Sequence, residues 1–207
     1  KRQKSTVVNL IPRFYDASAG QVCFLGQDVR KYRRKELRDQ IGIVPQKAVL
    51  FAGTVRENMQ WGKKDATDEE IWEALKTAQA EEFIRAKEGG LDANIEQGGR
   101  NLSGGQRQRL TIARALVKKP RVLILDDSAS ALDYATDAAL RKAIRQMEGA
   151  PTVFIVSQRT SSLMSADRIL VLDDGEATGY GTHEELLKNC QTYREIYNSQ
   201  YGKKEEA

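Results

Sequence analysis

Residues 102–127 read LSGGQRQRLTIARALVKKPRVLILDD, and the fold class follows from this stretch. It begins with a serine and two glycines, continues as a helical pattern over Arg107–Val117, and ends in an aliphatic run followed by Asp126 and Asp127. Continuous aliphatic strands are typical of a parallel sheet that is covered on both faces. The stretch therefore predicts an α/β fold, with ligands bound at the edge where such strands end.

The first five residues, Leu102-Ser103-Gly104-Gly105-Gln106, have the features of an anion site. Ser103 supplies a hydroxyl, and the two glycines let the backbone approach a ligand closely. The start of the following helix presents free amides and a positive dipole end. A glycine-containing turn with a helix cap is an alternative that also explains these residues.

The aspartates after the aliphatic run predict a metal and water site. Asp126 would hold Mg²⁺ directly or through water, and Asp127 is placed to orient an attacking water. The alternative is a pair of aspartates that caps the following turn. Asp133, in Ser130–Asp133, could likewise be a plain N-cap for the next helix.

Further elements follow from the same reasoning. Three aliphatic runs predict buried parallel strands: Arg121–Leu125, Val153–Val156 and Ile169–Leu172. Four helical segments are predicted: Thr67–Lys87 with a Thr67/Glu70 capping box, Tyr134–Met147, the short Ser161–Ser165, and about two turns after a Thr182/Glu185 capping box. We expect roughly 50–115 to be a mainly helical insertion and 202–207 to be a frayed tail. His183, the chain's one histidine, is expected to be surface structure.

The N-terminus contains the end of a phosphate-binding loop, whose form is G-x-x-x-x-G-K-[ST]. Lys4, Ser5 and Thr6 fit, and an apolar, helix-like run, Val7–Ile11, follows. Gln3 stands where glycine is required, and the strand and loop that should come first are absent. Taken without the other motifs, Lys4, Ser5 and Thr6 are also explained by chance or by a solvated basic terminus.

Composition limits the classes of protein. The 207 residues are 40% hydrophobic and 30% charged, which fits one soluble domain and excludes a disordered chain. No run approaches the ~18 apolar residues of a membrane helix. The cysteines, Cys23 and Cys190, are too few for a disulfide framework, so we expect a reducing compartment. A net charge of +4 is weak evidence for nucleic acid, and no nucleic-acid partner is expected.

Taken in order, Lys4–Thr6, Gln46, Leu102–Gln106, Leu123–Asp127 and Ser130–Asp133 resemble the nucleotide-binding domain of ABC transporters over nearly the whole chain. The resemblance implies a RecA-like P-loop NTPase core at 1–49 and 116–201, with an inserted helical subdomain at about 50–115. It implies ATP and Mg²⁺ as cofactors. It also implies that the first strands and most of the phosphate loop are missing.

The resemblance also implies roles for individual residues. Lys4, Ser5 and Thr6 would be the remnant of the Walker A motif that binds phosphate, with Ser5 also on Mg²⁺, and Asp126 would be the Walker B metal ligand. Gln46 looks like the glutamine that reaches Mg²⁺ and links the core to the helical subdomain. Leu102–Gln106 would be the signature that acts on the ATP of a second, head-to-tail domain, and Asp133 would end the D-loop. Glu96 resembles the acidic residue of the X-loop.

Two positions depart from the family pattern. Asp127 stands where the catalytic glutamate is usual, and Gln158 stands where a histidine is usual after the Val153–Val156 strand. Glutamine can hydrogen-bond a γ-phosphate but cannot take up a proton near neutral pH. With an intact signature, this combination resembles one half of a heterodimeric exporter whose own ATP site is degenerate.

The expected function is therefore an ATPase domain that powers export, attached at the cytoplasmic face of the plasma membrane. Residues Leu50–Asn58 resemble the exporter subclass, in which this region meets the coupling helix of a membrane domain. Three alternatives stay open: a homodimeric exporter with reduced activity, a non-hydrolysing regulatory half, and a soluble ABC protein of DNA repair or translation. The last class lacks the exporter-like stretch.

Overall fold

The computed structural model describes residues 2–201, apart from the side chains of Arg2, Gln3 and Ala129. The predicted tail Gly202–Ala207 and the side chain of Gln3 thus lie outside the described residues. The α-helices are α1 (Arg2–Asn9), α2 (Arg34–Asp39), α3 (Val55–Gln60), α4 (Asp68–Thr77), α5 (Glu81–Arg85), α6 (Gly104–Leu116), α7 (Tyr134–Arg145), α8 (His183–Asn189) and α9 (Gln191–Tyr201).

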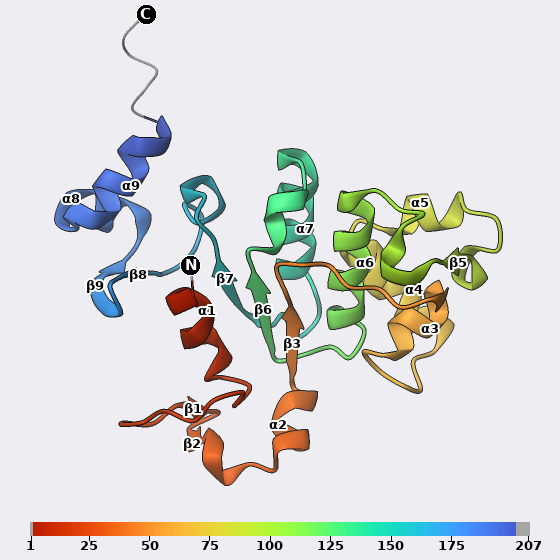
Figure 1. Ribbon diagram of the computed structural model, residues 1–207, viewed down its shortest axis with the longest axis horizontal. Helices are drawn as coiled ribbons and strands as arrows, with labels where there is room; N and C mark the ends of the chain where they lie inside the picture. The colour runs from red at the N-terminus through yellow and green to blue at the C-terminus, as the bar shows by residue number, and fades with distance from the viewer. Residues whose placement is uncertain (1, 202–207) are drawn as a thin grey trace, which may run out of the picture.

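A parallel sheet lies at the centre of the molecule (Figure 1). It consists of β3 (Ile41–Val44), β6 (Val122–Asp126) and β7 (Thr152–Val156), with β6 in the middle. The strands are in register: Val44 is level with Leu125, and Asp126 is level with Val156. The predicted strands at 121–125 and 153–156 are confirmed, whereas β3 was not predicted.

Both faces of β6 are covered, which is why this strand is aliphatic from Val122 to Leu125. Leu123 and Leu125 pack into a large core with helices α4, α6 and α7. Val122 and Ile124 pack into a smaller core with α1, α2 and the hairpin of β1 (Cys23–Phe24) and β2 (Gln27–Asp28). The result is a helix–sheet–helix arrangement, as expected for a parallel sheet.

The other strands form antiparallel pairs: β1 (Cys23–Phe24) with β2 (Gln27–Asp28), β4 (Gly53–Thr54) with β5 (Asn94–Ile95), and β8 (Ile169–Asp173) with β9 (Glu176–Gly181). The prediction that Ile169–Leu172 is a parallel strand is therefore wrong. Asp174 and Gly175 both have positive φ, so the chain turns back at once and β8 pairs with β9 in the described part of the chain.

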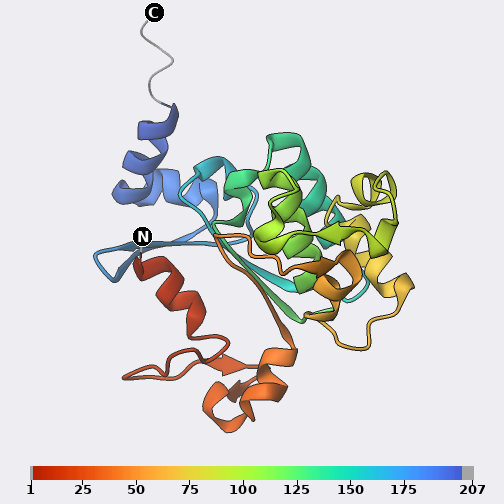
Figure 2. The ribbon, with the colours of Figure 1, turned by 45° about the vertical axis from the view of Figure 1, so that its right-hand side comes forward.

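The segment predicted as a helical insertion holds α3, α4, α5 and α6, together with the short β4–β5 pair (Figures 1 and 2). The Thr67/Glu70 capping box is confirmed in both directions. The helical pattern that we predicted over 67–87 is broken, however, because Gln79 has φ +59° and separates α4 from α5. The boundaries of the subdomain stay a prediction.

The C-terminal part lies beside the β8–β9 hairpin (Figure 1). The Thr182/Glu185 capping box opens α8 as predicted, and α9, which was not predicted, follows it. The predicted helix at 161–165 is only a 3₁₀ turn, Thr160–Ser162. Among residues 2–201, no helix is both long enough and apolar enough to cross a membrane.

Candidate functional site

A polar cavity of about 350 Å³ lies where the three parallel strands end. Gln46 follows β3, Asp126 ends β6, and Gln158 follows β7, so the register of the sheet brings these side chains to one edge. The first turns of α1 form another wall. Six predicted site residues line this cavity: Lys4, Ser5, Gln46, Asp126, Asp127 and Gln158.

Asp126 and Ser5 are in direct contact across this cavity. The Ser5 hydroxyl donates to Oδ1 of Asp126 at 3.0 Å, although the residues are 121 positions apart in sequence. A carboxylate, a hydroxyl and the amide oxygen of Gln46 thus line one space. Hard oxygen donors of this kind fit Mg²⁺, which takes one or two carboxylates from a protein and further oxygens from water and phosphate.

Asp127 is fixed by both its side chain and its backbone. Gln46 Nε2 donates to Asp127 Oδ2 at 2.9 Å, and the Asp127 amide donates to the Val156 carbonyl at 2.8 Å. Asp127 has φ +49°, a left-handed conformation that Asp tolerates better than most residues. The turn after it is closed by Ser130, whose hydroxyl donates to the main-chain oxygen of Asp127 at 2.9 Å. The hydrogen bonds found for the two carboxylates come from Ser5 and Gln46, on the side of the cavity.

Four further residues line the cavity that sequence reasoning missed: Val156, Ser157, Ile196 and Gln200. Gln200 Nε2 donates to the main-chain oxygen of Gln158 at 2.7 Å. Ile196 and Gln200 come from α9, at the far end of the chain. No local motif marks them, because only the tertiary fold brings α9 to this edge.

The predicted anion site at Leu102–Gln106 lies outside the polar cavity. None of Leu102, Ser103, Gly104, Gly105 and Gln106 lines the cavity. Ser103 is the N-cap of α6: its hydroxyl accepts from the Gln106 amide, and the Gln106 side chain accepts from the Ser103 amide. The helix-cap alternative thus describes the local structure correctly, and it leaves the remaining amides of the first turn without intrahelical acceptors.

The glycines of this stretch differ in what surrounds them. A Cβ on Gly105 would lie 3.3 Å from the main-chain oxygen of Ala131, so that glycine suits a close contact within the chain. A Cβ on Gly104 would meet nothing closer than Arg107 at 3.9 Å. Packing among the described residues therefore does not require glycine at 104.

Three other predicted residues lie outside the cavity. Asp133 is the N-cap of α7 and accepts from the amide and the hydroxyl of Thr136, at 2.8 and 2.7 Å. These hydrogen bonds, that of the amide first, hold the pKa of Asp133 below its usual value. Thr6 is exposed on α1, and Glu96 is exposed just before a 3₁₀ turn. Neither lines the cavity.

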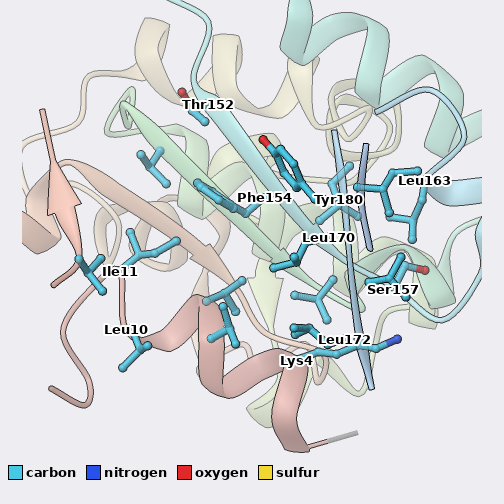
Figure 3. A pocket seen from close by; sticks show the side chains of 18 of the residues that line it. Lys4, Leu10, Ile11, Thr152, Phe154, Ser157, Leu163, Leu170, Leu172 and Tyr180 are labelled. Atoms are coloured by element: carbon cyan, nitrogen blue, oxygen red, sulfur yellow. The ribbon is translucent and has the colours of Figure 1, made fainter. Parts of the chain in front are cut away.

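A larger, mainly apolar hollow of about 680 Å³ adjoins the polar cavity (Figure 3). The two share five lining residues: Lys4, Val156, Ser157, Gln158 and Ile196. The walls of the larger hollow come from α1, β7 and the β8–β9 hairpin, and include Ile11, Phe154 and Leu170. Few polar groups line it. The carboxylates of Asp126 and Asp127 line the smaller cavity and not the larger hollow, so the smaller cavity is the better candidate for chemistry.

Comparison with known proteins agrees with this arrangement. The family described as ABC transporter matches residues 4–130. YfiB of Bacillus subtilis, an uncharacterized ABC transporter ATP-binding protein, is 47% identical over 200 residues, which cover 97% of this chain and 35% of YfiB. YgaD of the same organism, a putative multidrug export ATP-binding/permease protein, is 43% identical over 197 residues, which cover 95% of this chain and 34% of YgaD.

The fold agrees as well. A bacterial Atm1-family ABC exporter, solved with ATP bound, superimposes with a TM-score of 0.90 at 37% identity, covering 96% of this chain and 35% of that one. The chain thus spans about a third of the length of the relatives that it matches. Its sequence, its sheet and its polar cavity lead to one assignment: the chain belongs to the ABC transporter family, as a nucleotide-binding domain of the exporter type.

Proposed function

We propose that this chain binds ATP and Mg²⁺ in the polar cavity and powers export of a substrate across a membrane. One observation carries the proposal: a single cavity gathers Lys4, Ser5, Gln46 and Asp126 from three separate parts of the chain. Lys4 supplies a cation for the phosphates at the start of α1, where the helix amides also favour an anion. The similarity to YgaD, a putative multidrug export protein, and to the ATP-bound exporter structure supports the same function.

In this proposal Mg²⁺ is held by Ser5, Gln46 and Asp126. When bound, the ion would neutralise charge on the phosphate oxygens. Asp127 would orient the attacking water, and its hydrogen bond to Gln46 would link that carboxylate to the metal site. Gln158 would donate to the γ-phosphate.

The signature Leu102–Gln106 acts on the ATP of a second nucleotide-binding domain, packed head to tail. Its place outside this chain's own cavity supports the proposal, because within one chain it has no nucleotide to contact. Gly104 supports it further: in the described part of the chain a Cβ there would meet nothing closer than a guanidinium nitrogen of Arg107, at 3.9 Å, so a phosphate of the partner's ATP can approach. Asp133, also outside the cavity, belongs to the same interface.

The chain's own site turns over slowly, and the intact signature completes a competent site on a partner chain. Asp127 is one methylene shorter than glutamate, so its carboxylate is set back by roughly 1.5 Å. Gln158 offers no proton acceptor where a histidine would. A non-hydrolysing regulatory half is the second candidate, and the bond that engages Asp127 with Gln46 favours it.

The membrane partner is a transmembrane exporter domain that presents its coupling helix near Leu50–Asn58, at the cytoplasmic face of the plasma membrane. An exposed aromatic pair supports this contact. The rings of Phe51 and Trp61 lie 4.9 Å apart, and Trp61 is 69% exposed. Arg114 lies over the Phe51 ring, 5.7 Å from its centroid, and would hold the ring in place.

The experiment compares two single variants of the full-length transporter. Ser103→Arg blocks the signature, and Lys4→Ala removes the phosphate cation from the cavity. A photoreactive ATP analogue reports binding to this chain, and phosphate release reports turnover. Ser18→Arg, in an exposed loop, is the matched control for Ser103→Arg.

Ser103→Arg should keep the label on this chain and abolish most turnover, because it disables the partner's competent site. Lys4→Ala should lose the label and keep most turnover. If Ser103→Arg loses the label and Lys4→Ala keeps it, the cavity is not the ATP site. If both variants abolish turnover equally, the two sites are equivalent, as in a homodimer.

A further inference from the structure

The last helix, α9, contributes two side chains to the nucleotide cavity that the proposed chemistry does not use. Ile196 and Gln200 are four residues apart and thus share one face of the helix. Ile196 is half-buried, while Gln200 carries the polar group. Gln200 lies 42 residues beyond Gln158, so its contact with the loop that follows β7 depends on the tertiary fold.

The amide of Gln200 bridges two residues of the loop that follows β7. Its Oε1 accepts from both the amide and the hydroxyl of Thr160, each at 3.0 Å. Its Nε2 donates to the main-chain oxygen of Gln158 at 2.7 Å. A main-chain amide can only donate and a carbonyl can only accept, so these partners fix the orientation of the side-chain amide.

The bridge holds the loop at the point where Gln158 enters the cavity. Thr160 is buried, with 2% of its surface exposed, and anchors one end of the bridge. On the other side, the Ser157 hydroxyl accepts from the Arg159 amide at 3.0 Å. The main chain of Gln158 is thus held from both sides, while its side chain stays exposed to the cavity.

We propose that Gln200 is a positioning residue that holds Gln158 against the terminal phosphate, and that it thereby makes the cavity prefer a nucleoside triphosphate to a diphosphate. The inference rests on the proposed function. Gln158 can donate to a γ-phosphate, which a diphosphate lacks. A hydrogen bond to a charged group of this kind corresponds to roughly tenfold in affinity.

Two substitutions separate the two ends of the bridge. Gln200→Ala removes all three hydrogen bonds. Gln200→Glu keeps an acceptor for Thr160 but places an oxygen opposite the Gln158 carbonyl, where a donor is needed. Gln191→Ala is the matched control, because Gln191 lies on the same helix. Its side chain donates to Glu195 on the exposed surface.

Binding is measured in the full-length transporter. A radiolabelled azido-ATP is competed with Mg²⁺ and either AMP-PNP or ADP, and the label is counted on this chain alone. Gln200→Ala and Gln200→Glu should each weaken competition by AMP-PNP about tenfold and change competition by ADP less than twofold. Gln191→Ala should match the wild type. The proposal is overturned if competition by AMP-PNP and by ADP weakens equally. It is also overturned if Gln200→Glu competes like the wild type.

Hydrogen exchange at the Thr160 amide tests the bridge without nucleotide. Protection should fall in Gln200→Ala and persist in Gln200→Glu and in Gln191→Ala. Unchanged protection in Gln200→Ala shows that the bridge does not hold the loop and overturns the proposal. If azido-ATP does not label the wild-type chain, both the proposed function and the nucleotide preference are contradicted. A loss of Thr160 protection in Gln200→Ala would still establish the bridge in that case.

Discussion

Replacing Asp127 by glutamate should speed ATP hydrolysis at the chain's own site. The present carboxylate ends one methylene short of the position that glutamate would reach, and Gln46 Nε2 holds it at 2.9 Å. A displacement of about 1 Å in a catalytic group costs up to ~10²-fold in rate. Asp127→Glu should therefore raise turnover at this site by as much as ~10²-fold.

The same substitution should cost stability, for a separate reason. Asp127 has φ +49°, and a residue with a longer side chain is less favourable in this left-handed region by about 1 kcal/mol. Asp174 has φ +44° in the turn between β8 and β9, away from the cavity. Asp174→Glu is therefore a matched control that should lower the free energy of unfolding equally and leave turnover unchanged.

The assay uses the full-length transporter with the partner's own Walker motifs inactivated, so that phosphate release reports this chain's site. Urea unfolding of both variants reports the cost in stability. If Asp127→Glu leaves turnover at the wild-type level while it loses as much stability as Asp174→Glu, then the reach of the carboxylate does not limit this site. The explanation of slow turnover would then be wrong.

Three further predictions concern other parts of the chain. Gly62→Ala should lower the free energy of unfolding by about 1–3 kcal/mol in urea, because the new Cβ would lie 2.1 Å from the main-chain oxygen of Arg114. Hydrogen bonds from Arg30 lower the pKa of Asp28 to about 2. The stabilising contribution of Asp28 is therefore present above about pH 4 and is lost as the pH falls toward 2. The melting temperature of Asp28→Asn should fall less than that of the wild type over this range. Gln158→His should make turnover at the chain's own site rise between about pH 6 and 7, where the wild type should be flat, because only the neutral imidazole can accept a proton.

The sequence predicted the central strands well where burial alone determines residue type. The aliphatic run of β6 is covered on both faces, so the residue types alone predict a buried strand there. In β3 the glycine at 42 obscured the pattern. A Cβ there would lie 2.9 Å from the Ala115 oxygen, so glycine is needed because the end of α6 packs against the strand.

At β8, in contrast, residue types alone predict the wrong kind of strand. Its aliphatic run resembles a buried strand, yet Leu170 is 47% exposed and the neighbours Ile169 and Val171 are buried. Asp174-Gly175 is a turn signal that favours antiparallel pairing, because both residues have positive φ.

The candidate site was predictable only as far as local motifs extend. Short patterns indicate Lys4 and Asp126, the resemblance to ABC domains indicates Gln158, and the cavity brings the three together. Gln200 carried no signal, because its role depends on the docking of α9 against a loop that is distant in sequence. For Leu102–Gln106 the local pattern predicts an anion site without placing it, whereas the resemblance assigns the stretch to the ATP of a second domain.

The claim that the cavity is a site for ATP with Mg²⁺ is tested most directly by the equilibrium binding of AMP-PNP to this chain in the full-length transporter, with and without Mg²⁺. Asp126 is the metal carboxylate in this account, and Ser5 donates to it at 3.0 Å. Mg²⁺ should strengthen binding to the wild type and should lose most of this effect in Asp126→Asn. An equal effect of Mg²⁺ on both proteins would contradict the assignment of this cavity.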